Sequence, residues 1–208
     1  MPNRQFAARV ALGFRAHSGW AAAVALGGST SDPIVLDRRH IAIAENALRG
    51  AKQPYHAAEP LPIEEARALI HKCRLSSESL AVEAIRALLA EVTPGRHAVG
   101  SGVLVGSGLT LPPLPKILQS HVLLHRAEGE FFREVLALAS DRCSLRVTRV
   151  REKEIWERGA AALRLDAGAV RERITAIGAL VGPPWTQDEK MAALAAWVVL
   201  AESGKAGA

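Results

Sequence analysis

The amino-terminal part of the chain contains three apolar runs separated by short turn signals. The runs cover residues 7–14, 20–27 and 34–43, and they are interrupted by Gly19 and by the sequence GGSTSDP. Runs of this length that are rich in Val, Ile, Leu and Ala predict β-strands. A parallel pair would need a crossover of about a dozen residues or more, so the short connections predict an antiparallel meander. A fold for this chain must therefore include three antiparallel strands at its start.

The middle of the chain predicts helices and two further strands. Apolar residues recur at helical spacing from Ile63 to Val92, and the serines of RLSSES can begin a new helix, so two helices or one kinked helix fit equally. The preceding sequence KQPYHAAEPLP predicts a loop. HAVGSGVLVGSG and SLRVTRV predict a fourth and a fifth strand. The fourth is expected to be parallel to the first, because helices connect them.

Helices are predicted in the second half of the chain near residues 121–140, 152–164, 167–180 and 187–203. Asp166 is placed to cap the third of these helices. Thr186 and Glu189 have the spacing of a capping box at the start of the fourth. The predicted order of strands and helices is that of an α/β protein.

Length and composition favour a single domain over residues 1–208. A chain of 208 residues with 49% hydrophobic and 23% charged residues can bury a hydrophobic core. This composition argues against a disordered chain and against a small protein that is held together by disulfides. Cys73 and Cys143 have no metal-ligand spacing, so a reducing, cytoplasmic location is expected. No signal-peptide core is found, and the apolar run MAALAAWVVLA is shorter than the ~20 residues that cross a bilayer. We therefore expect no membrane partner.

The charge of the chain permits a nucleic-acid partner. Lys and Arg outnumber Asp and Glu by 26 to 21, and this excess favours phosphate-bearing molecules. Trp156, Trp185 and Trp197 are predicted to anchor the core around the last helices. Phe, Trp and Tyr make up only 4% of the chain, too few for a surface that stacks single-stranded bases.

The segment SHVLLHRAEGEFFRE contains a candidate site. At about 100° per residue, His121, His125 and Glu128 fall within about 60° of one another on a helix, beside its apolar face. Two histidines at i and i+4 can bind one ion, and a carboxylate one turn later can be a third ligand or orient a ring. His121, His125 and Glu128 are therefore candidate catalytic residues and candidate ligands of a divalent metal.

Two other interpretations of His121, His125 and Glu128 remain open. The same groups can act without a metal, as hydrogen-bonding or acid–base groups. They can also form a satisfied polar network at the edge of the core, in which the histidines bond to the backbone or to Glu128.

Two stretches, VALGFRAHSGWAAAVAL near the start of the chain and DEKMAALAAWVVL near its end, carry a resemblance to a known family. The first is similar to the first hairpin, and the second to the last, acidic helix, of the RuvC-type Holliday-junction resolvases of the ribonuclease H-like superfamily. The predicted order of elements resembles theirs as well. The resemblance implies a ribonuclease H-like α/β fold with a mixed five-stranded sheet, three antiparallel strands followed by parallel ones, flanked by helices. It also implies nucleic acid as the first partner to test.

The acidic cluster that this resemblance implies is degenerate. Such nucleases hold Mg²⁺ with carboxylates, one of them on the first strand, where this chain has Phe14 and Arg15. The end of the fourth strand, the usual place of another acid, has the sequence VGSG at residues 105–108. Asp188 and Glu189 remain in the last helix, and Glu189 also fits the cap. The family's usual metal-dependent cleavage is therefore not predicted.

The glycine-rich sequence GSGVLVGSG is a second candidate site. It is not a P-loop, and Gly100 and Gly102 are expected to mark close packing of a strand. Backbone N–H groups of its exit turn can bind phosphate, at the carboxyl end of a strand where α/β sheets bind ligands. On the predicted topology, Ser107 and His121 converge with the hairpin turn that begins at Arg15, and an arginine there can bind a phosphate directly. The candidate ligand-binding residues are Arg15, His17, Ser107 and Gly108.

Three functions are compatible with these features. The first is a ribonuclease H-like protein that associates with nucleic acid but lacks most of the metal-binding acids. The second is a small-molecule or metal-dependent enzyme that uses His121, His125 and Glu128. The third is a non-catalytic assembly protein, possible as a homo-oligomer, because the last predicted helix is apolar and rich in alanine. Whether the chain is an enzyme is left open.

Overall fold

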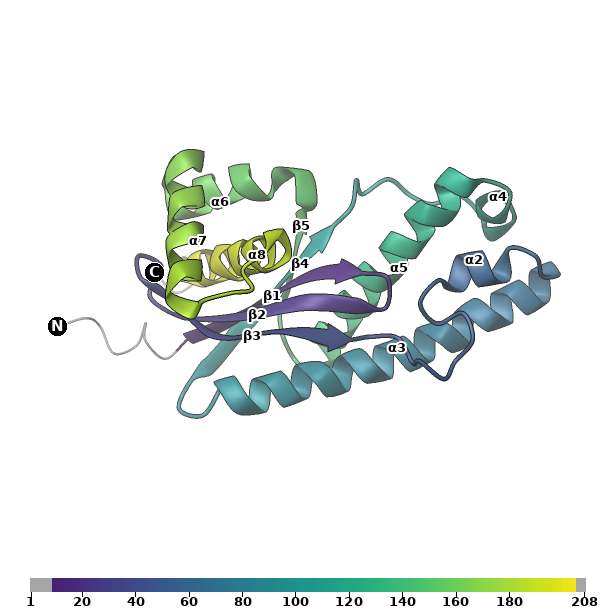
Figure 1. Cartoon of the computed structure of the whole chain (residues 1–208), viewed down its shortest axis with the longest axis horizontal. Coiled ribbons are helices and arrows are strands. Elements are labelled where there is room, and N and C mark those ends of the chain that lie inside the picture. Colours follow the sequence, from purple (N-terminus) through teal and green to yellow (C-terminus); the bar gives the residue numbers. More distant parts are fainter. Residues whose placement is uncertain (1–8, 205–208) are drawn as a thin grey trace.

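The computed structural model describes residues 9–204, which form a mixed sheet with helices on both faces (Figure 1). The strands are β1 (Arg9–His17), β2 (Trp20–Gly28), β3 (Pro33–Ala42), β4 (His97–Val105) and β5 (Val147–Arg151). They lie in the order β3-β2-β1-β4-β5. The first three pair antiparallel, whereas β4 is parallel to β1 and β5 is parallel to β4. The predicted meander, the parallel fourth strand and the α/β class are confirmed.

The helices are α2 (Pro54–Ala58), α3 (Ile63–Val92), α4 (Leu114–Leu118), α5 (His121–Arg142), α6 (Ile155–Leu163), α7 (Ala167–Val181) and α8 (Gln187–Ser203), with a 3-10 turn, η1 (Glu152–Glu154), before α6. α3 is one continuous helix, so the sequence RLSSES does not divide it into two helices. The predicted loop over residues 52–62 is wrong in part, because it contains α2. Pro54 begins α2, where its missing N–H has no helical partner to lose.

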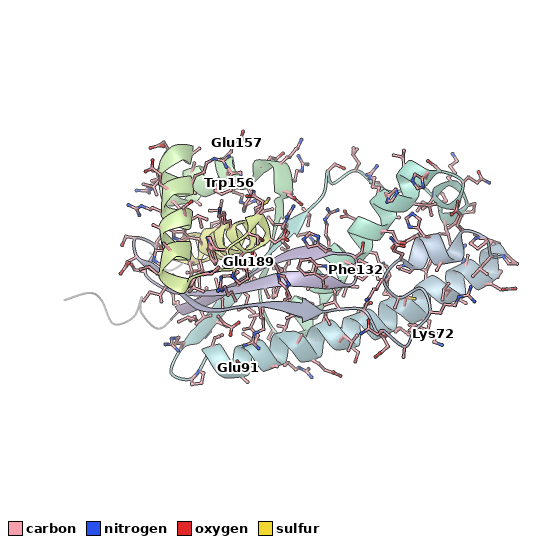
Figure 2. The ribbon with its side chains drawn as sticks, viewed as in Figure 1. Lys72, Glu91, Phe132, Trp156, Glu157 and Glu189 are labelled. Atoms are coloured by element: carbon pink, nitrogen blue, oxygen red, sulfur yellow. The ribbon has the colours of Figure 1, made fainter. Side chains whose placement is uncertain are left out.

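Both faces of the sheet are buried, and side chains alternate between them along each strand. On β1, Val10, Leu12 and Phe14 belong to the core under α3 and α5, whereas Ala11 belongs to the core under α6, α7 and α8. Phe132, labelled in Figure 2, lies in the first of these cores. This burial explains why the central strands are almost continuously apolar.

α8 packs directly on the sheet because β1 and β4 carry glycines beneath it. Gly13 and Gly102 are register partners on these strands. A Cβ atom on Gly13 would lie 1.9 Å from the carbonyl oxygen of Ala192, and one on Gly102 would lie 2.6 Å from that of Ala195. The prediction that Gly102 marks close packing is therefore confirmed, and the alanines of α8 are the small residues that allow the contact.

The tryptophans anchor the core around α8, as predicted. Trp197 is fully buried and donates a hydrogen bond from Nε1 to the carbonyl oxygen of Thr30 at 2.9 Å. Trp156 and Trp185 are partly buried against the same core. Residues 191–201 of α8 are all buried, so this apolar helix is covered within the chain. The apolar composition of α8 is therefore no argument for association between copies of the chain. A homo-oligomer stays a prediction.

α2 and α4 lie beyond the sheet, beside the ends of α3 and α5 (Figure 1). α2 contacts both α3 and α5, and α4 contacts α5. The amino-terminal end of α5, which carries His121 and His125, therefore packs against helices and not against strands.

Candidate functional site

Arg15, near the carboxyl end of β1, joins two acidic side chains from distant parts of the chain. Its guanidinium donates to Asp188 of α8 and, at 2.6 Å, to Glu152 of η1. Burial opposes the charge of Arg15, but hydrogen bonds and charges from Glu152 and Asp188 raise the pKa of Arg15 above its ordinary value. Arg15 is therefore a fixed cation between two carboxylates.

Strands β1, β2 and β3 add His17, Trp20 and His40 to this cluster. Nε2 of His17 lies 3.0 Å from the same oxygen of Asp188 that Arg15 contacts. The Trp20 ring stacks on His17 at a centroid distance of 4.2 Å and contacts His40 at 4.3 Å. His40 in turn lies 2.9 Å from Oε1 of Glu189. Both acids at the start of α8 are thus already paired with side chains from the sheet.

Glu189 is the cap that its spacing predicted (Figure 2). Its Oε2 accepts hydrogen bonds from the backbone N–H of Thr186 at 2.8 Å and from the Thr186 hydroxyl at 2.6 Å. Burial opposes ionisation, but the hydrogen bonds from Thr186 and His40 hold the pKa of Glu189 below its ordinary value. Both oxygens of this carboxylate therefore have structural partners.

A magnesium site of the resolvase type does not fit this edge of the sheet. Mg²⁺ needs several oxygen ligands close together, and the position on β1 is occupied by buried Phe14 and by Arg15. The Arg15 guanidinium forms ion pairs with both Asp188 and Glu152. Glu189 is engaged in the cap. The cluster is an ion-pair network with an arginine as its cation.

Three arginines surround the exposed turn that follows β4, which we call the glycine turn (residues 106–109). A Cβ atom on Gly106 would lie 2.9 Å from Nη1 of Arg133. One on Gly108 would lie 3.5 Å from Nε of Arg151. Arg126 donates a hydrogen bond to a backbone carbonyl of the same turn. Helix α5 and strand β5 thus bring three guanidinium groups to one short, glycine-containing segment.

The ion pairs of these arginines are weak. Arg151 lies 3.2 Å from Glu154, with 50% and 42% of the two side chains exposed. Arg133 lies 3.5 Å from Glu130, and the latter is also substantially exposed. Exposed pairs of this kind contribute about 0–1 kcal/mol, so an incoming anion can compete with the carboxylates.

The residues that were predicted to converge have different partners in the structure. Arg15 and His17 share Asp188 at the end of β1, whereas His121 lies at the start of α5. Within residues 9–204, Ser107 makes no hydrogen bond or ion pair with His17 or His121. Ser107 and Gly108 belong instead to the exposed glycine turn, beside Arg151. The convergence of these residues on one site therefore stays a prediction.

His121 and His125 do come together on α5, and a third histidine joins them. Their Nε2 atoms lie 3.0 Å apart, as the i, i+4 spacing predicts for one helix face. His56 of α2 packs against both rings, at centroid distances of 6.0 Å and 4.8 Å. One ring nitrogen from each of the three lies within 4.8 Å of the others. We call His56, His121 and His125 the histidine triad.

Glu128 lies behind the triad. It is 4% exposed, and its Oε1 accepts hydrogen bonds from the backbone N–H groups of Tyr55 and His56 at 2.8 and 3.0 Å. The same oxygen lies 3.1 Å from Nδ1 of His56. Burial raises the pKa of Glu128, although these hydrogen bonds oppose the rise. Glu128 thus positions His56, and His56 takes the place beside His121 and His125 that was predicted for this carboxylate.

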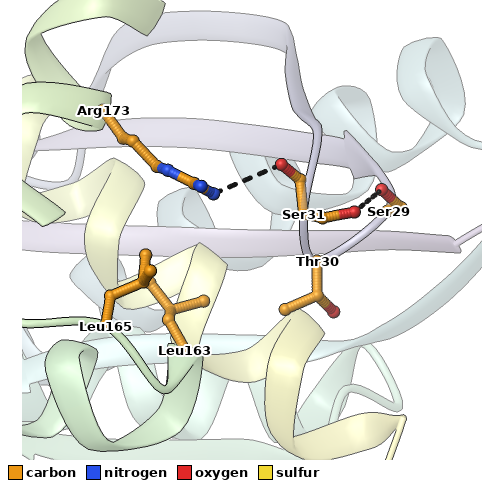
Figure 3. A pocket seen from close by; sticks show the side chains of 6 residues that line it. All are labelled: Ser29, Thr30, Ser31, Leu163, Leu165 and Arg173. Atoms are coloured by element: carbon orange, nitrogen blue, oxygen red, sulfur yellow. Dashed lines mark hydrogen bonds between the residues drawn. The ribbon is translucent and has the colours of Figure 1, made fainter. Parts of the chain in front are cut away.

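A surface hollow of about 450 Å³ lies at the opposite end of the sheet, between the β2–β3 turn and the α6–α7 connection (Figure 3). Arg173 donates to the backbone carbonyl of Ser31 at 3.4 Å across one side of it. Leu163 and Leu165 line the other side. The hollow is open and contains no cluster of catalytic side chains, so we do not assign it a function.

His56 and the three arginines of the glycine turn were not identified from the sequence. His56 lies in a segment that was predicted as loop, and the partners that position it are on α5. Arg126 and Arg133 lie on α5 and Arg151 ends β5, so only the fold brings all three to the glycine turn. His56 lies within the five residues of α2, and a single histidine in so short a segment is only a weak local signal.

No helix within the described part of the chain is both long and apolar enough to span a membrane. No protein-family model matches the sequence, and no curated protein matches it. Two similar solved structures are RuvC of Thermus thermophilus and the same protein in complex with Holliday junction substrate. Their identities to this chain are 10% and 11%, and their TM-scores are 0.49 and 0.48. Each comparison covers 94% of this chain and 96% of the other. The strand order and connectivity of this chain are those of the predicted mixed five-stranded sheet, with three antiparallel strands followed by parallel ones.

Proposed function

We propose that this protein binds nucleic acid through backbone phosphates at the glycine turn and does not cleave it by a two-metal mechanism. The observation that carries the proposal is the placement of Arg126, Arg133 and Arg151 around residues 106–109. A guanidinium presents a planar fork of N–H donors that matches two oxygens of a phosphate. Three of them on one exposed turn suit a chain of phosphates better than a single small anion.

The position of the turn supports this proposal. It follows a parallel strand at its carboxyl end, which is where open α/β sheets bind their ligands. Ser107 and Gly108 are exposed there, so an extended polyanion can approach the backbone. The absence of large side chains on two of the turn residues allows close contact with the phosphates.

Arg15 argues against cleavage at the neighbouring edge. Two-metal hydrolysis requires carboxylates that hold two cations about 3.5–4 Å apart. Asp188 and Glu152 are instead paired with Arg15, and Glu189 caps α8. The proposed activity is therefore binding alone.

Fluorescence anisotropy with labelled duplex, single-stranded and four-way-junction DNA tests the proposal. The four-way junction is included because one of the similar structures contains Holliday junction substrate. Binding is expected to weaken when Arg126 and Arg151 are both replaced by Ala, and to persist in Arg96→Ala. Arg96 is exposed at the amino end of β4, so its replacement removes charge at the opposite edge. Equal loss in both variants, or cleavage of bound DNA with added Mg²⁺, would refute the proposal.

A further inference from the structure

We propose that the histidine triad binds one divalent transition-metal ion, such as zinc. This inference concerns other residues than the proposed nucleic-acid function and does not depend on it. The site would be formed by His56 of α2 together with His121 and His125 of α5.

The spacing of the ring nitrogens is close to what one ion requires. Two nitrogens bound to a tetrahedral zinc ion at about 2.0–2.1 Å lie about 3.3 Å from each other. Nε2 of His121 and Nε2 of His125 are 3.0 Å apart and face each other. All three ligand nitrogens lie within 4.8 Å, so a small rotation of the rings places them around one centre.

Glu128 gives His56 the orientation that a metal ligand needs. The carboxylate lies 3.1 Å from Nδ1 of His56, which leaves Nε2 of that ring as the nitrogen for the ion. Metal-binding histidines commonly donate their other N–H to a carboxylate in this way, which fixes the tautomer and makes the ring a better ligand. Glu128 is therefore a positioning residue, and not one of the ligands.

The buried state of Glu128 is a second observation that favours a cation here. Its Oε2 atom is buried and has no hydrogen-bond partner within the described part of the chain. A carboxylate in such surroundings is stabilised by positive charge nearby. An ion on His56 would supply that charge through the ring.

The donor set identifies the class of metal. Imidazole nitrogens suit zinc, copper, nickel and cobalt, whereas Mg²⁺ and Ca²⁺ prefer oxygen. Three protein ligands leave one position of a tetrahedral ion for water or an exchangeable anion. His121 and His125 are exposed, so solvent can reach that position.

A purely structural role of the triad makes a different prediction from metal binding. An exposed histidine pair that only shares a hydrogen bond would leave the protein indifferent to zinc. Because His121 and His125 are both exposed, replacing either by Ala should leave the fold intact, and the two explanations can be separated without unfolding the protein.

The test is a zinc titration of the purified full chain in competition with a chromophoric chelator. One ion per chain is expected for the wild type. His125→Ala is expected to weaken zinc binding by more than about 100-fold, since losing only an outer hydrogen-bond partner of a ligand costs up to about that factor. His97→Ala is the matched control, because His97 is exposed at the amino end of β4 and outside the triad.

X-ray absorption on the zinc-loaded protein gives an independent readout. The proposal predicts three imidazole nitrogens at about 2.0–2.1 Å from the metal. Absence of zinc binding, binding that is unchanged in His125→Ala, or an equal loss in His97→Ala would overturn it. Glu128→Gln is expected to weaken binding by about 10–100-fold while His121 and His125 remain in place.

Discussion

Glu128 on α5 accepts hydrogen bonds from both the backbone N–H and the ring of His56 on α2, at 3.0 Å and 3.1 Å. The first N–H groups of a helix have no partner within the helix itself. Gln53, the residue before α2, makes no capping hydrogen bond with its side chain. A carboxylate from another helix therefore caps α2, and the same contact brings His56 to the triad.

Replacing Glu128 by Ala is expected to lower the free energy of unfolding by about 1–3 kcal/mol, because buried N–H groups of α2 lose their acceptor. Chemical denaturation measures this change. Glu134→Ala is the control on the same helix, since Glu134 is 42% exposed and pairs only with a surface arginine. Its effect should stay within about 0.5 kcal/mol. Equal effects of the two substitutions would contradict the capping role of Glu128.

Gly13→Ala is expected to destabilise the protein strongly. A Cβ atom at Gly13 would overlap the backbone of α8, which cannot move aside as a flexible side chain can. Overpacking of a core typically lowers the free energy of unfolding by about 1–3 kcal/mol, and a backbone clash belongs at the upper end. Gly129→Ala is the control, because the three atoms nearest to a Cβ there all belong to the flexible Arg133 side chain. A thermal shift that is the same for both variants would disprove the close packing of α8.

The lowered pKa of Glu189 predicts a pH-dependent contribution to stability. A carboxyl whose pKa is lower in the folded than in the unfolded protein stabilises the fold above its ordinary pKa of 4.5, and this contribution is lost as the pH falls through the folded value. Glu189→Gln keeps a capping side chain but removes the charge. It should be less stable than the wild type at neutral pH by about 0.5–1 kcal/mol.

Denaturation across a pH series checks this prediction for Glu189. The difference between Glu189→Gln and the wild type should shrink once the pH is well below 4.5, where the wild-type carboxyl becomes protonated. Glu202→Gln, at the exposed end of α8, should show little difference at any pH. A difference for Glu189→Gln that stays constant with pH would mean that its charge is not involved.

Arg15 is expected to make the edge of the sheet insensitive to magnesium. The unfolding temperature of the wild type should not change with added Mg²⁺, because the Arg15 guanidinium already pairs with both Asp188 and Glu152. Arg15→Asp replaces the cation by a third carboxylate, and this variant should be stabilised by Mg²⁺. Adding Asp188→Asn to the variant should remove the gain. A wild type whose unfolding temperature rises with Mg²⁺ and depends on Asp188 would contradict the ion-pair network.

Local sequence patterns predicted most of the fold because they report on burial. The strands of the first meander, the parallel fourth strand and the buried α8 all follow from apolar spacing and short turns. α2 could not be predicted in this way. Its five residues are too few for a helical pattern, and the carboxylate that caps it is 72 residues away from His56 in the sequence.

The candidate sites were harder to predict than the fold, because they depend more on tertiary contacts. The spacing of His121 and His125 was sufficient to predict that they meet, because both lie on one helix. The pairing of Arg15 with Glu152 and Asp188 spans 137 and 173 residues, and no local pattern contains it. The partners of a long charged side chain depend on which residues the fold brings near it. Such ion-pair networks can therefore be identified only from the structure.

The most direct test of the proposed function is the salt dependence of duplex DNA binding, measured by anisotropy for the wild type and for the Arg126→Ala, Arg151→Ala double variant. Each phosphate contact steepens the slope of log affinity against log salt by about 0.9. Loss of two such contacts should therefore reduce the slope by about 2 and weaken binding at low salt. The same slope in both proteins, or no binding by the wild type at low salt, would contradict phosphate recognition at the glycine turn.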